Sequence, residues 1–154
     1  MFIYTLVIPV LVYVIGSYID RRYHMYGNKL LLITASLLFS ASLFLPSPII
    51  NGIDTEFWAH FFGGGVFIGL LCVYFRPLLK RELEWYQELM LLFIFVSTFG
   101  VINELYELFS SEIGIYDELL DDTSWDLLAN SLGALVFFLL YKGINRLKTL
   151  FISR

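Results

Sequence analysis

Four side chains in the long apolar segments of this chain could do chemistry: His60, Glu104, Glu107 and Asp126. An ionisable side chain is costly inside a membrane-spanning helix, so its presence there indicates a function. Two carboxylates one turn apart also repel each other, and neither Glu104 nor Glu107 lies where it could cap a helix. Carboxylate oxygens suit Mg²⁺, Ca²⁺ or Mn²⁺, and one imidazole extends the choice to Zn²⁺ or Fe²⁺. We therefore expect these four residues to be catalytic and to ligate a divalent metal ion.

Further polar side chains share the helix faces of these four at 100° per residue. Glycines follow on the same stripes, and they predict close approach of the helix backbones. The residues expected to bind a ligand or substrate are Asn103, Asp122 and Asn130.

Less specific roles remain open for some of these residues. Asp126 fits position N3 of a capping box that begins at Thr123. His60 could be a hydrogen-bonded packing residue, and Asn130 could bond across helices. Without a metal ion, clustered carboxylates would share protons, and one of them would become a general acid.

The composition identifies the environment in which this chemistry would take place. Of 154 residues, 58% are hydrophobic and only 16% are charged, and the mean hydropathy is +0.75. Soluble domains are nearer half apolar and one quarter charged. This balance excludes a soluble enzyme, a nucleic-acid-binding protein and a disordered chain, and it predicts an integral membrane protein. Nucleic acid is also excluded as a partner because the ten basic residues are divided among three short segments.

The hydropathy pattern predicts an all-α, polytopic helical bundle forming a single domain over 1–154. A spanning helix needs roughly 20 mostly apolar residues. Pro46 and Pro48 are expected to end the second helix, because proline lacks an N–H group. The expected spans are about 1–19, 30–48, 56–75, 87–110 and 124–141.

The charge pattern predicts the orientation of the bundle. With five spans, all ten basic residues fall on one side, which the positive-inside rule assigns to the cytoplasm. The opposite side carries ten acidic residues and no basic ones. We expect a multi-pass protein of the cell membrane, with the N-terminus outside and the C-terminus inside.

Three segments carry a resemblance to a known family. Asp54–Gly69 (DTEFWAHFFGGGVFIG), Phe99–Phe109 (FGVINELYELF) and Asp121–Phe138 (DDTSWDLLANSLGALVFF) resemble, in family order, segments of VanZ-like membrane proteins, and of YjdF-type proteins in particular. The resemblance implies a small helical bundle with a polar cluster at one membrane face. VanZ-like proteins are associated with glycopeptide (teicoplanin) resistance, and no settled reaction comes with that association. The residues that match the family pattern are His60, Glu104, Glu107, Asp122, Asp126 and Asn130.

The function expected from these observations is that of a metal-dependent membrane enzyme acting on a lipid or lipid-linked head group at the outer face. The alternative is a non-catalytic lipid-binding or accessory membrane subunit. An ion or proton transporter is less favoured, because the acids cluster at one end and the other halves of the helices are apolar.

Overall fold

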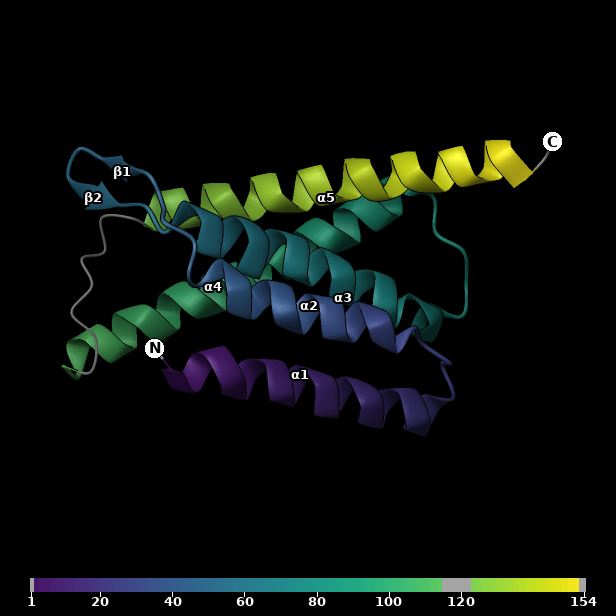
Figure 1. Cartoon of the computed structure of the whole chain (residues 1–154), viewed down its shortest axis with the longest axis horizontal. Coiled ribbons are helices and arrows are strands. Elements are labelled where there is room, and N and C mark those ends of the chain that lie inside the picture. The colour runs from purple at the N-terminus through teal and green to yellow at the C-terminus, as the bar shows by residue number, and fades with distance from the viewer. Residues whose placement is uncertain (1, 115–122, 153–154) are drawn as a thin grey trace.

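The computed structural model describes residues 2–114 and 123–152 and is almost entirely helical (Figure 1). The helical character expected from the sequence is confirmed, with a short two-stranded hairpin added. Within the described residues, three helices are long and apolar enough to cross a membrane: Ala59–Leu79, Trp85–Glu112 and Thr123–Lys148. The elements are α1 (Phe2–Tyr23), α2 (Lys29–Ser42), β1 (Ile49–Ile50), β2 (Ile53–Asp54), the π-helix η1 (Ala59–Val66), α3 (Phe67–Phe75), the 3₁₀-helix η2 (Arg76–Leu79), α4 (Trp85–Glu112) and α5 (Thr123–Ile152).

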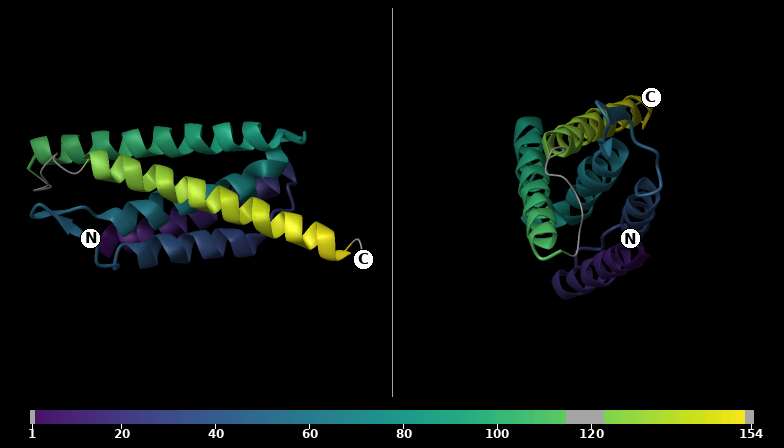
Figure 2. Two further views of the ribbon diagram at one scale, coloured as in Figure 1. Left: turned by 90° about the horizontal axis from the view of Figure 1, so that it is seen from above. Right: turned by 90° about the vertical axis from the view of Figure 1, so that its left-hand side faces the viewer.

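The continuous rod formed by η1 and α3 runs through the middle of the bundle, between the α1–α2 pair and the α4–α5 pair (Figure 2). Side chains from α2, α3, α4 and α5 form the hydrophobic core around it. Its buried members are Ala35, Phe67, Ile68, Leu92, Val96, Ala134 and Phe138. Because η1 and α3 pack against α2, α4 and α5, the side chains of η1 are brought into contact with those helices.

The second helix is shorter than the 30–48 expected from the sequence. It ends at Ser42, and the N–H groups of Phe44 and Leu45 then bond to carbonyls only three residues back. The cause is Pro46, which has no N–H for the carbonyl of Ser42 and disfavours helix in the residue before it. The earlier end leaves room for a β-hairpin before the next helix.

The β-hairpin pairs Ile49 with Asp54 and Ile50 with Ile53. Asn51 and Gly52 both have positive φ, as a two-residue hairpin turn of type I′ requires. Thr55 closes the base, since its N–H and hydroxyl groups both donate to the carbonyl of Pro48. The hairpin therefore fixes the point at which the chain enters the central rod.

Other boundaries also differ from the expected spans. The helix expected over 56–75 has a π-helical half, and the last helix continues from 141 to Ile152. The first runs to Tyr23 through Pro9 without a break. Pro9 has no N–H for the carbonyl of Thr5, and the hydroxyl of Ser40 donates to that carbonyl at 2.8 Å. This bond explains how a proline is accommodated inside α1.

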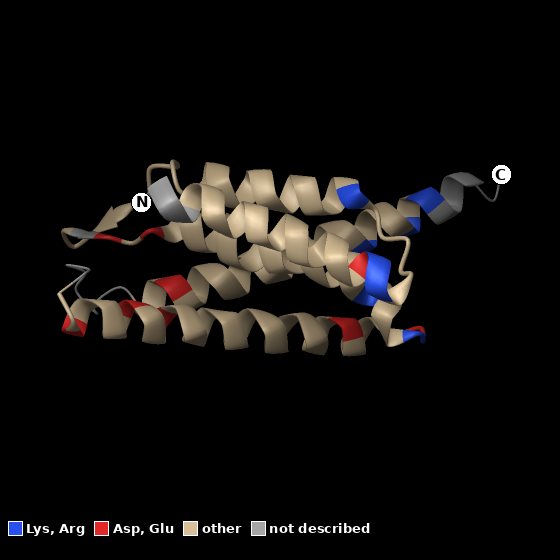
Figure 3. Cartoon of the chain, turned by 90° about the horizontal axis from the view of Figure 1, so that it is seen from below, with Lys and Arg blue, Asp and Glu red and all other residues tan. Residues whose placement is uncertain are grey.

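The described lysine and arginine residues gather at one end of the bundle, and most of the described acidic residues lie toward the other end (Figure 3). The described lysines and arginines lie toward the end that holds the α1–α2 and η2–α4 connections. Most of the described acids lie toward the hairpin and the C-terminus of α4. These are called the basic end and the acidic end below.

Candidate metal centre

Three of the four expected ligands converge at the acidic end. His60 of η1, Glu104 of α4 and Asp126 of α5 each offer a ligand atom, and these atoms all lie within 4.8 Å of one another. His60 Nε2 lies 3.3 Å from Asp126 Oδ1, and their side chains are only 11% and 2% exposed. These three residues, named the triad below, come from three helices that are distant in sequence.

The π-helix that carries His60 combines stacked aromatic rings with glycines. Four aromatic side chains, Phe57, Trp58, Phe61 and Phe62, stack edge-to-face or in parallel around its first turn. Three consecutive glycines, residues 63–65, follow in the same π-helix. π-Helical segments are rare and occur frequently at functional sites.

The glycines bring η1 against α5 at backbone contact distance. A Cβ on Gly65 would meet the carbonyl oxygen of Asn130 and would lie 2.6 Å from the N atom of Ala134. A Cβ on Gly133 would meet the carbonyl oxygen of Phe61. The backbones therefore approach closely at Gly133, which lies on the predicted stripe, and at Gly65, which lies off it. This contact holds His60 beside Asp126.

Asn130 lies one helical turn from Asp126 and is buried between two other helices. A Cβ on Gly64 of η1 would collide with its Oδ1 atom, and a Cβ on Gly100 of α4 would lie 3.2 Å from its Nδ2 atom. Asn130 is 4% exposed. Its Oδ1 atom has no hydrogen-bond partner within 2–114 and 123–152. The amide is thus held next to the triad with an acceptor available to a ligand or water molecule.

The remaining expected residues lie outside the triad. Asn103 Nδ2 donates to Glu107 Oε1 at 2.6 Å on an exposed part of α4. Glu107 is not a member of the group that could share one metal ion. Asp122 lies outside the described residues. Asp126 is in the first turn of α5. A carboxylate at this position also stabilises the helix, because its negative charge interacts favourably with the helix dipole.

The donor set of the triad fits a divalent cation. One imidazole nitrogen and two carboxylate groups are ligands of Zn²⁺ and Mn²⁺, and the oxygens also suit Mg²⁺ and Ca²⁺. Two ligands of a tetrahedral ion with bonds of about 2.1 Å lie about 3.4 Å apart. The 3.3 Å between His60 and Asp126 matches this separation. Glu104 has the longest and most flexible side chain of the triad. A change in its side-chain conformation would bring its carboxylate to bonding distance of the ion.

No protein-family model, curated protein or solved structure matches this chain.

Two side-chain arrangements in this bundle were also missed from the sequence. Gly100, the only glycine in α4, makes room for Asn130, and its isolation in an apolar helix was the available signal. At the basic end, Glu88 pairs with both Arg76 and Lys142. Glu88 is one of the few acids on the side to which the sequence assigns the basic residues, and this placement was the signal for the cluster.

Proposed function

We propose that this chain is a multi-pass cell-membrane protein with five spans, with its N-terminus outside and its C-terminus in the cytoplasm. Three helices with the length and hydropathy of spans support this proposal. The separation of acidic from basic side chains supports the orientation, because basic residues favour the cytoplasmic side. The triad then faces the outer leaflet.

We propose further that the protein is a metal-dependent enzyme that acts on a lipid or lipid-linked head group. The observation that carries this proposal is the convergence of His60, Glu104 and Asp126 at one end of the bundle. Membrane-buried acids are costly, and a divalent cation offsets their mutual repulsion. The sequence resemblance to VanZ-like proteins points to the same polar cluster, and membership of that family is part of the proposal.

Each residue has a distinct part in this proposed function. A divalent ion would supply Lewis-acid polarisation of an ester or phosphoryl group and would lower the pKa of a water molecule. The triad would hold that ion. Asn130, with a buried acceptor atom, would orient a water molecule or a substrate N–H or O–H group. Glu107 lies one turn from Glu104, and its bond to Asn103 would position it to exchange protons with the head-group region.

Transport is less well supported by the interior of the bundle. Between the two charged ends, the described helices share a buried cluster of aliphatic and aromatic side chains. An ion or proton pathway needs polar groups along its whole length.

The first test is the metal content of the purified protein, measured by elemental mass spectrometry after incubation with Mg²⁺, Ca²⁺, Mn²⁺ and Zn²⁺. We expect one equivalent of metal in the wild-type protein and at least a tenfold loss in Glu104→Gln and His60→Ala. Glu107→Gln is the matched control, because it removes a neighbouring acid outside the triad, and it should keep the metal. Equal metal content in wild type and Glu104→Gln would refute the site.

The proposed enzymatic activity on lipid head groups needs a separate test. Metal-loaded protein incubated with membrane lipid extract should release a head-group product that is absent with Glu104→Gln. A metal-loaded protein that retains an intact bound lipid and releases nothing would instead indicate the lipid-binding role.

A further inference from the structure

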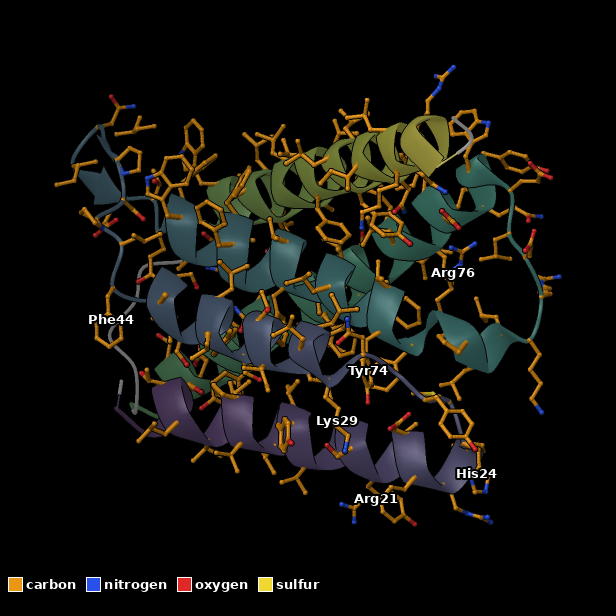
Figure 4. All side chains as sticks on the ribbon, turned by 45° about the vertical axis from the view of Figure 1, so that its right-hand side comes forward. Arg21, His24, Lys29, Phe44, Tyr74 and Arg76 are labelled. Atoms are coloured by element: carbon orange, nitrogen blue, oxygen red, sulfur yellow. The ribbon has the colours of Figure 1, made fainter. Side chains whose placement is uncertain are left out.

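A second charged cluster lies at the basic end, far from the triad. Glu88, in the first turn of α4, is 2.8 Å from Arg76 Nη2 of η2 and also contacts the ammonium group of Lys142 of α5. Figure 4 labels Arg76 at this end, with Tyr74 and Lys29, opposite Phe44. Two cations against one carboxylate leave a formal charge of +1.

The cations of this cluster face outward while the carboxylate does not. The side chains of Arg76 and Lys142 are 38% and 33% exposed, whereas that of Glu88 is only 10% exposed. The ammonium of Lys142 also lies 5.7 Å from the centre of the Phe138 ring, which holds it over the aromatic face. Several N–H donors of the two cations therefore remain available for a further anion.

An apolar groove opens beside these cations. It has a volume of about 50 Å³, and Arg76 and Glu88 line it together with apolar side chains from α3, α4 and α5. The apolar lining includes Cys72, Leu91 and Phe137. A groove of this kind next to a net positive charge, at the end of membrane-spanning helices, matches a molecule with an anionic head and an apolar chain.

We propose that this groove binds an anionic phospholipid, with its phosphate on Arg76 and Lys142 and the start of an acyl chain against the apolar wall. This inference rests on the proposed membrane placement, in which lipid head groups meet the basic side chains at this end of the bundle. Basic pockets between membrane helices bind anionic lipids. Guanidinium groups bind phosphate through paired N–H donors. The carboxylate of Glu88 competes with the phosphate for the two cations.

The test is native mass spectrometry of the full-length protein in detergent, titrated with phosphatidylglycerol or with phosphatidylcholine of the same acyl chains. The wild-type protein should bind phosphatidylglycerol about tenfold more tightly. Arg76→Gln and Lys142→Gln should each weaken that binding about tenfold, the cost of one charge-assisted hydrogen bond. Arg146→Gln is the matched control, because this exposed arginine lies one turn further along α5, and it should bind as wild type does.

Two more variants separate lipid binding from a purely structural ion cluster. Glu88→Gln removes the competing carboxylate and should tighten phosphatidylglycerol binding, whereas a structural role predicts only a less stable protein. Leu91→Trp fills the groove without changing charge and should weaken binding of the lipid. The proposal is overturned by equal affinity for the two lipids, by weaker binding in Glu88→Gln, or by an equal loss in Arg146→Gln.

Discussion

At the scale of single residues, Asn130 is the side chain on which the packing around the triad depends most. Its amide group lies between Gly64 of η1 and Gly100 of α4. Each glycine leaves the space that one end of the amide fills. Any side chain larger than hydrogen at Gly64 must displace the amide group of Asn130, which lies one helical turn from Asp126.

The first prediction concerns this contact. Gly64→Ala places a Cβ against Asn130 Oδ1 and should lower the free energy of unfolding by about 1–3 kcal/mol, the usual cost of overpacking. Asn130→Ala should remove most of that cost in the double variant, because the colliding atoms are then gone. Sodium dodecyl sulfate titration of protein in mixed micelles, arranged as a double-mutant cycle, measures the coupling.

Gly65→Ala is the control for this cycle. Its Cβ would meet backbone atoms of Asn130, Gly133 and Ala134, which no side-chain truncation can remove. Asn130→Ala should therefore leave the cost of Gly65→Ala unchanged. Additive effects of Gly64→Ala and Asn130→Ala would contradict the contact.

The residues of the triad could be predicted only in part from the sequence. Helical spacing places Glu104 and Glu107 on a common face, three residues apart. Spacing alone does not decide which acid turns toward α5, since that depends on how α4 packs. In the structure Glu104 joins the triad, while Glu107 bonds to Asn103.

At the scale of elements, the long helices follow from hydropathy, and the irregular segments do not. The expected span 87–110 closely matches α4, because this segment has no proline and a single glycine. The π-helix could not be predicted, since eight almost wholly apolar residues show no period that separates π from α winding. The hairpin had a signal in Asn51-Gly52, the typical pair of a type I′ turn.

The second prediction concerns the attachment of α1. Ser40→Ala removes the hydroxyl that donates to the carbonyl of Thr5, an acceptor that Pro9 leaves without a helical N–H donor. This variant should lower the free energy of unfolding by about 1 kcal/mol, a typical value for a hydrogen bond between membrane helices. In a Pro9→Ala background the restored N–H group should reduce that cost to near zero. Unfolding of the four proteins in mixed micelles measures both values.

Ser36→Ala provides the comparison. Ser36 donates to the carbonyl of Pro9 at 3.3 Å, and that carbonyl can also accept the N–H of residue 13 within the helix. This variant should cost less than Ser40→Ala. An equal cost of Ser40→Ala with and without Pro9 would show that the proline does not explain the bond.

At the scale of the whole molecule, the bundle separates two kinds of polar site by an apolar core. The acidic end holds the triad, and the basic end holds Glu88 with its two cations. Charge segregation was evident from the sequence, because topology requires it of basic residues. The convergence of His60, Glu104 and Asp126 from three helices was not evident from the sequence, because it depends on backbone contact between η1 and α5.

The central claim is that the triad binds a divalent metal through one imidazole and two carboxylates. X-ray absorption spectroscopy of the Zn²⁺-loaded protein tests it most directly. We predict nitrogen and oxygen ligands at about 2.0–2.2 Å and outer-shell scattering from one imidazole. His60→Ala should lose both the bound zinc and that scattering, whereas His24→Ala, which removes the other of the two histidines, should keep both. A spectrum without imidazole, or one unchanged in His60→Ala, would contradict the account.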